Sequence, residues 1–216
     1  VSSTVGGEEE QAEEPAIGFG NREPAMPLES NIAVDGDVVV PLDVHDFRFW
    51  LQGAFGAPET VGNVHAFASG GHVPSFALSV EHPKVPAFRR LGGLMVNSLS
   101  LSLDPGETAK NCTISVLGGS DVRATVTADA TPTQAPRERL VGQTGTLQID
   151  GAPAGVVIGG EVSFTNNLEQ GARQFGTRFF GEPSVGRTGF TGNVVVRFQD
   201  TALLDKAEAG APISLT

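Results

Sequence analysis

Within residues 97–104, NSLSLSLD, leucine alternates with a polar residue from Ser98 to Asp104. In a β-strand, successive side chains point to opposite faces of the sheet, so this segment turns Leu99, Leu101 and Leu103 inward and its serines outward. Asp-Pro-Gly at 104–106 ends the strand with turn residues. The segment therefore predicts a sheet with one buried face.

Strand and turn signals continue along most of the chain. Residues 75–82 place Phe76, Leu78 and Val80 on one face, and residues 31–44 predict a long strand or a strand pair. Further strands are expected near 111–117, 121–128, 144–150, 155–165 and 188–199, and a loop near 131–139. The 216 residues include 28 Gly and 14 Pro, which suits short strands joined by turns. We expect one mainly β domain spanning residues 1–216.

Two short stretches change to a helical period. Within residues 46–55 the apolar side chains recur at i, i+3, i+4, i+7 and i+8. Asp46 or Asp43 is positioned to cap this helix, and Gly56 followed by Pro58 ends it. Residues 200–210 predict a second helix, with Asp200 as its cap and Gly210 as its end. The residues predicted to pack the first helix against the core are Phe47, Trp50, Leu51 and Phe55.

The two ends of the chain resemble each other. At a constant offset of 156, residues 19–40 match residues 175–196 at 8 of 22 positions without a gap. With a two-residue slip, the likeness extends to 19–58 and 175–212, each copy giving strand, loop, strand and short helix. We therefore predict a β-sandwich or barrel with an internal duplication and one or two short flanking helices. Because residues before the second copy have no counterpart, we also expect a strand ahead of Val1.

Charge is concentrated near the beginning of the chain. The formal net charge is −11, and residues 1–50 hold 11 acidic residues against Arg22 and Arg48. Residues 6–15, GGEEEQAEEP, lack apolar periodicity and predict a loop that is disordered in an isolated subunit. This loop is either a solvated tether or a contact to a neighbouring subunit. The candidate contact residues are Glu8, Glu9, Glu10, Glu13 and Glu14, with Arg89, Arg90, Arg137 and Arg139 as their partners.

No pattern in the chain points to catalysis. The single Cys112 excludes an internal disulfide and is expected to be a small buried side chain. The spacings of His45, His65, His72 and His82 match no compact metal-ligand motif, and no nucleophile elbow, P-loop or dinucleotide fingerprint occurs. We expect no catalytic residues, metal or cofactor. The excess of acidic over basic residues also argues against tight nucleic-acid binding, which needs clustered Lys and Arg.

Four stretches, in order along the chain, carry a family resemblance. They are FGNRE at 19–23, GDVVVPLDVHDFRFWLQGAFGAP at 36–58, HVPSFALSVEHPKVPAFRRLGGLMVNSLSLSLDPG at 72–106 and GFTGNVVVRFQDTALLDKAEAGAPISL at 189–215. The chain resembles the major tail tube proteins of long-tailed bacteriophages and related tail-like particles. The likeness covers most of residues 17–216.

This resemblance implies a structural subunit of the virion tail. Such subunits form hexameric rings, inner strands of the six join into one barrel, and rings stack into a tube that conducts genomic DNA without binding it. Other tail proteins would contact the tube ends, and assembly would take place in the cytoplasm of the bacterial host, with no membrane partner. The family has no catalytic residues to carry over.

Two other functions stay open from the residues alone. A carbohydrate- or host-binding β-sandwich module would need exposed aromatic platforms, yet the chain has no Tyr and a single Trp on a helix face. A β-rich enzyme is the third alternative, although no residue pattern indicates which reaction it would catalyse.

Overall fold

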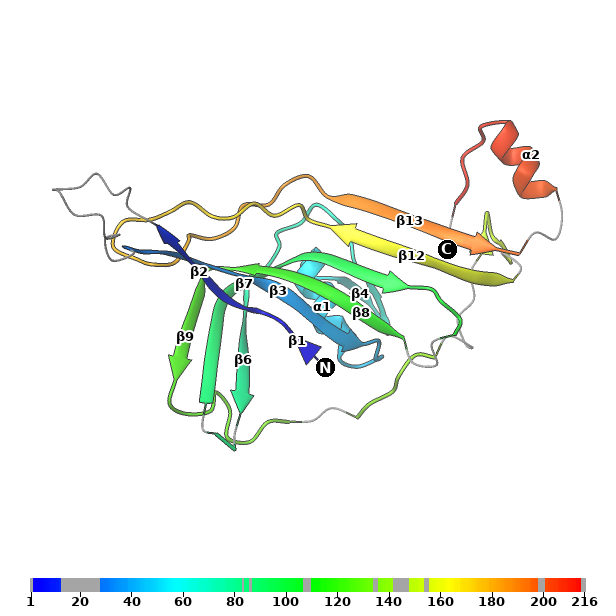
Figure 1. Cartoon of the computed structure of the whole chain (residues 1–216). Coiled ribbons are helices and arrows are strands. Elements are labelled where there is room, and N and C mark those ends of the chain that lie inside the picture. The colour runs from blue at the N-terminus through cyan, green and yellow to red at the C-terminus, as the bar shows by residue number, and fades with distance from the viewer. Residues whose placement is uncertain are drawn as a thin grey trace.

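The computed structural model describes residues 2–12, 28–82, 84–85, 87–106, 110–133, 136–141, 148–153, 156–197 and 201–214 (Figure 1). Its strands are β1 (Ser2–Ser3), β2 (Gly6–Ala12), β3 (Leu28–Pro41), β4 (Glu59–Val61), β5 (Val64–Ala66), β6 (Phe76–His82), β7 (Ala87–Ser102), β8 (Asn111–Gly118), β9 (Ser120–Ala124), β10 (Gln148–Ile149), β11 (Ala152–Pro153), β12 (Val157–Thr165) and β13 (Gly189–Val196). Its helices are α1 (Phe47–Phe55) and α2 (Ala202–Glu208).

One large antiparallel sheet organises the molecule. Its main order is β1-β3-β8-β7-β12-β13, with β2 beside β3 and with β6 and β9 beside β7. The prediction of a mainly β fold with short helices is confirmed. Within the described ranges the sheet stays open, and it does not close into a barrel in the single chain.

Strand β7 belongs to two parts of this sheet. Its first half pairs with β6 and β9, while its second half pairs with β8 and β12. Gly93, between the two halves, has φ +66°, a backbone conformation that glycine adopts without steric cost. The part with β6 and β9 consequently turns away from the long strands β3, β8, β12 and β13 (Figure 1).

The acidic segment forms a strand. Residues 6–12 are β2, which lies antiparallel to β3 and continues the line begun by β1. The prediction of a loop is therefore wrong for this part of 6–15, and the rest of that segment, including Glu13 and Glu14, lies outside the described residues. Glu8 and Glu9 stand opposite Ala33 and Ile32, so no like charges face each other across the pair. Water screens the repulsion between neighbouring glutamates.

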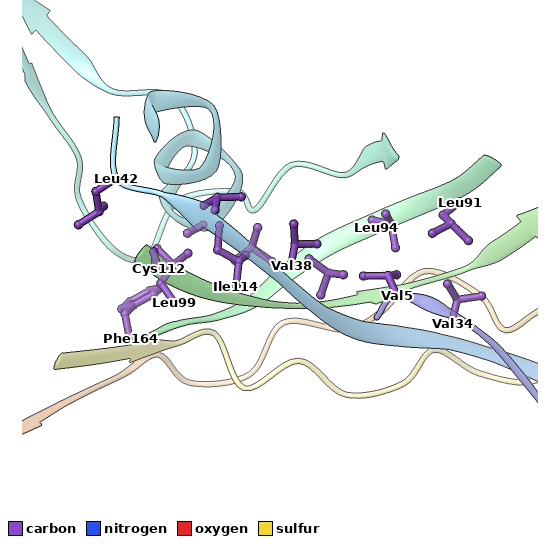
Figure 2. Packing of buried hydrophobic residues seen from close by; sticks show 14 residues of the cluster. Val5, Val34, Val38, Leu42, Leu91, Leu94, Leu99, Cys112, Ile114 and Phe164 are labelled. Carbon is purple, nitrogen blue, oxygen red and sulfur yellow. The ribbon is translucent and has the colours of Figure 1, made fainter. Parts of the chain in front are cut away.

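The hydrophobic core lies on the inner face of β3, β7 and β8 (Figure 2). Its largest fully buried side chains are Val34, Val38, Leu91, Leu94, Val96, Cys112, Ile114 and Val116. The predicted burial of Cys112 is confirmed. Leu99 is buried as predicted, whereas Leu101 and Leu103 are only half-buried. The reason is that α1 covers β7 around Val96 and leaves the end of the strand more open.

Helix α1 packs against the core through one face. Phe47, Trp50, Leu51 and Phe55 are each half-buried against the core cluster, and the Phe55 ring lies 4.3 Å, centroid to centroid, from Phe164 of β12. The helix can approach β7 closely because residue 53 is glycine: a Cβ there would come within 3.1 Å of Val96. Gly56 ends the helix with φ +89°.

The N-terminal turn of α1 depends on Asp43 rather than on Asp46. Asp46 makes no side-chain capping bond. Instead, the Asp43 carboxylate accepts hydrogen bonds from the backbone N–H groups of His45, at 2.9 Å, and Asp46, at 3.3 Å. The second helix, α2, falls within the predicted range 200–210, and Asp200 lies outside the described residues.

The two similar segments share an order of elements. The valines of 38–40 lie on β3, which follows β2 and precedes α1, and those of 194–196 lie on β13, which follows β12 and precedes α2. Their surroundings differ, since β3 is an inner strand while β13 pairs with β12 alone in the described chain. That the two halves superpose as duplicated units stays a prediction.

Candidate assembly surfaces

The acidic strand β2 makes ion pairs within its own chain. Glu9 lies 2.8 Å from the guanidinium of Arg178, across a separation of 169 residues. Glu8 is exposed on the same strand. Glu10 also belongs to β2. At least one of the candidate contact glutamates is thus engaged inside the subunit.

Arg89 and Arg90, two of the four candidate partners of the acidic segment, also make contacts within the chain. Arg89 of β7 forms an ion pair with Asp121 of β9, with Nε donating to Oδ1 at 3.1 Å. Asp121 also accepts a 3.0 Å hydrogen bond from the N–H of Gly7, and so connects β9 to the acidic strand. Arg90 donates to the carbonyl of Thr127 at 3.4 Å. These contacts hold β2, β7 and β9 together.

The second arginine pair lies beside helix α1. Arg137 and Arg139 are exposed and, with Asp43, Phe47, Phe49 and Trp50, line a cavity of about 320 Å³. We call this the α1 cavity.

One wall of the α1 cavity carries a buried carboxylate. Asp43 is 3% exposed. The backbone hydrogen bond from His45 is the main cause that lowers the pKa of Asp43 below its ordinary value, and burial acts in the opposite direction. The carboxylate is therefore ionised at neutral pH. Its Oδ2 finds no hydrogen-bond donor among the residues that the structure describes.

One margin of the sheet is formed by β13. This strand pairs with β12 on one side and with no other strand in the described chain. Exposed apolar side chains accompany it, namely Phe190, Val195 and Ile158. Unpaired backbone groups on an edge strand are a template for pairing with another chain.

A long two-stranded arm extends from the sheet between β12 and β13 (Figure 1). Residues 166–188 run out and back, paired at Glu169 with Ser184 and at Arg173 with Phe180. Near its turn the arm also lies along β3, where the N–H of Ile32 donates to the carbonyl of Arg178 at 2.7 Å. Phe175, in the turn itself, is fully exposed. The sequence reasoning missed this arm, because its pairing has no apolar alternation.

The described residues were also searched for a metal-binding cluster and for a membrane-spanning helix. In the described ranges, no three His, Cys, Asp or Glu side chains are grouped so that they could hold a metal ion. Among the helices of the same ranges, none is long and apolar enough to cross a membrane.

A mainly β chain with open sheet margins and a projecting arm agrees with the resemblance seen in the sequence. A family model described as phage tail tube protein matches residues 2–216. The chain belongs to this family. The search of curated proteins found no match. As a phage tail tube protein, the chain is a structural component of a tail and is located in the virion. Family membership over nearly the whole chain favours this function over a carbohydrate-binding module or an enzyme.

Proposed function

We propose that this tail tube protein forms hexameric rings and that these rings stack into a tube that conducts genomic DNA. The observation that carries the proposal is the open sheet. In the long-strand part of the sheet, β13 forms one margin and β1 with β2 forms the other, and within the described residues neither margin has a second pairing partner.

Two different margins favour a closed ring. When β13 of one subunit pairs with β1 or β2 of the next, the contact joins unlike surfaces, and such head-to-tail contacts close into a ring when the rotation between subunits permits. Closure would pair β13 with β1 or β2 all around the ring and make the six sheets continuous through their long strands. The acidic β2 favours this arrangement, because two copies of β2 placed edge to edge would repel each other.

The charge of the chain supports a conduit rather than a DNA-binding protein. Tight binding to DNA depends on Lys and Arg that neutralise phosphates, whereas this chain has 14 Lys and Arg against 25 Asp and Glu. A tube of such subunits repels the duplex on average. The DNA would therefore move through without adhering to the wall.

The proposed partners follow from this role. Other tail proteins would contact the free faces of the first and last rings, and the rings would assemble in the cytoplasm of the bacterial host before the virion is complete. No cofactor and no catalytic step are part of the proposal.

Sedimentation and negative-stain images of the purified protein test the proposal. We expect six-fold rings at moderate protein concentration and tubes at high concentration. We also expect double-stranded DNA to remain unbound at physiological salt in a mobility-shift assay. A protein that stays monomeric over the whole concentration range would contradict the assembly, and tight DNA binding would contradict the conduit.

A further inference from the structure

The sheet has two chemically different faces along its long strands. Residues that stand directly opposite each other in an antiparallel pair point to the same face. Leu99 stands opposite Ile114 and Phe164, and these three side chains belong to the hydrophobic core. Because side chains alternate along a strand, the neighbours of these residues point the other way. One face of the sheet is therefore apolar, and the neighbours of the core residues form the second face.

Hydroxyl groups dominate this second face. Ser100 of β7 stands opposite Thr113 of β8 and Ser163 of β12, and Ser163 stands opposite Thr191 of β13. We use the name hydroxyl face for the polar side chains of residues 98–102, 111–115, 161–165 and 191–193. Ser and Thr account for eight of these eleven side chains, and Glu161 is the one charged residue among them. All eleven are exposed or half-buried.

Lys and Arg are absent from the long strands. The chain has 14 of these residues, yet none occurs in β3, β8, β12 or β13, or in residues 94–102 of β7. The surface of a soluble protein ordinarily carries charged residues of both signs. A sheet face that only meets water has no physical reason to exclude cations. The composition of the hydroxyl face therefore points to a function for that face.

The bulky elements of the subunit stand on the opposite, apolar face. Helix α1 packs there, with the ring of Phe55 against Phe164 of β12. Strand β6 lies on the same side, since the ring of Phe76 is 5.7 Å from that of Trp50 in α1, centroid to centroid. In a closed ring, every subunit turns the same face toward the axis. The convex side of a curved wall has more room than the concave side, so α1 and β6 fit outside and the hydroxyl face lies inside.

A hydroxyl-lined wall suits a DNA duplex that has to move. Lys and Arg would neutralise phosphates and hold the DNA, and the long strands contain neither residue. Hydroxyl groups donate to and accept from water, so a layer of water separates the wall from the duplex. We propose that the hydroxyl face lines the lumen of the tube and is the surface past which double-stranded DNA moves. This inference rests on the proposed tube and assigns its inner surface to particular residues.

The accessibility of single cysteines in assembled tubes tests this assignment. Ser163→Cys places a thiol on the hydroxyl face, and Val61→Cys places one on the hairpin after α1, where Val61 is 81% exposed. Native Cys112 is buried. The tubes are treated with N-ethylmaleimide or with maleimide-coated gold particles wider than the lumen. We expect the small reagent to label both variants, and the gold to decorate only Val61→Cys tubes along their length. Free subunits of both variants should bind gold.

Two results of this labelling would overturn the inference. One is gold along the length of Ser163→Cys tubes. The other is a thiol at position 163 that N-ethylmaleimide labels in free subunits but not in tubes, since this thiol would lie in a contact between subunits. Ser115→Cys on β8 repeats the measurement at a second position, and it decides if Ser163→Cys does not fold. In each case the proposed function stands, whereas a parent protein that forms no tubes would contradict both.

A positive charge on the hydroxyl face tests why Lys and Arg are absent from it. We expect Ser163→Arg tubes to retain short double-stranded DNA at low salt, protected from nuclease, and to release it as the salt concentration rises. The parent and the matched control Ser163→Asn should retain none. Ser163→Arg tubes that retain no more DNA than the parent would contradict the inference. If Ser163→Arg does not assemble, the cysteine labelling decides.

Discussion

One buried side chain joins helix α1 to the sheet. The Asn166 amide nitrogen donates to the carbonyl of Ala54, at the end of α1, and to that of Val96, in β7, both at 2.9 Å. Asn166 is 1% exposed. Asn166→Ala would leave both carbonyls without this donor, and an unsatisfied buried polar group costs about 1–3 kcal/mol. We expect a loss of about 2–3 kcal/mol in the free energy of unfolding, measured by urea denaturation.

The control for this prediction is an exposed asparagine. Asn193→Ala removes a hydrogen bond to the N–H of Glu161 on the outer strand pair, where water replaces the lost partner. Its effect should remain within about 0.5–1 kcal/mol. Equal effects of the two substitutions would contradict the role given to Asn166.

Cys112 should be chemically inert in the folded protein. Burial in the core raises the pKa of its thiol from 9.0 to about 11, and only the thiolate reacts readily. We expect negligible labelling by iodoacetamide at pH 8 in the native state and rapid labelling in 8 M urea. Because the folded state holds this proton up to a higher pH than the unfolded state, the group should also lower stability as the pH rises from about 9 to 11. Fast labelling of the native protein would contradict the burial.

At the scale of single elements, the acidic strand β2 could not be predicted from its own residues. The glutamates of β2 have no apolar pattern, and the strand exists because its backbone pairs with β3. That partner begins 16 residues after β2 ends, and nothing local indicates it. The alternating leucines and the helix at 46–55 were predictable, since each pattern specifies its own element. Asn166, the arm at 166–188 and the α1 cavity depend on contacts between distant segments, and the local patterns do not encode them.

The charge on β2 should keep subunits from pairing through identical edges. Replacing Glu8, Glu9, Glu10, Glu13 and Glu14 by Gln removes this repulsion, and the loss of the exposed pair with Arg178 costs the subunit only about 0.2–1 kcal/mol. We expect a folded monomer that forms irregular aggregates. The difference from the parent should be largest at low salt, where repulsion in the parent is strongest. Light scattering that matches the parent at every salt concentration would contradict this role.

Helix α2 is attached to the turn between β10 and β11 through Asp150. Asp150, between β10 and β11, pairs with Lys206 of α2 and accepts a 2.7 Å hydrogen bond from the N–H of Ser214. The bond from Lys206 is the main cause that lowers the pKa of Asp150 below 3.8. A carboxyl group with a lowered folded pKa stabilises the fold above its unfolded pKa and loses this effect as the pH falls through the folded value.

Hydrogen exchange of residues 201–214 measures this attachment. We expect the protection factors of α2, which are the intrinsic exchange rates divided by the observed rates, to fall below about pH 3.8. We expect the same fall in Lys206→Met at neutral pH, while Glu208→Gln behaves as the parent. Protection factors that stay constant between about pH 5 and 3 and are unchanged in Lys206→Met would show that the pair does not hold α2.

At the scale of the whole molecule, ring assembly depends on the difference between the two margins of the long-strand part of the sheet. Strand β13 is apolar and exposed, and β1 with β2 forms the opposite margin, which is acidic. A reconstruction of the assembled particle by electron cryomicroscopy would show which strands pair between subunits. We expect six subunits per ring, with β13 of each hydrogen-bonded to β1 or β2 of the next. A ring in which β13 stays open to solvent, or pairs with a second β13 across a two-fold axis, would contradict this expectation.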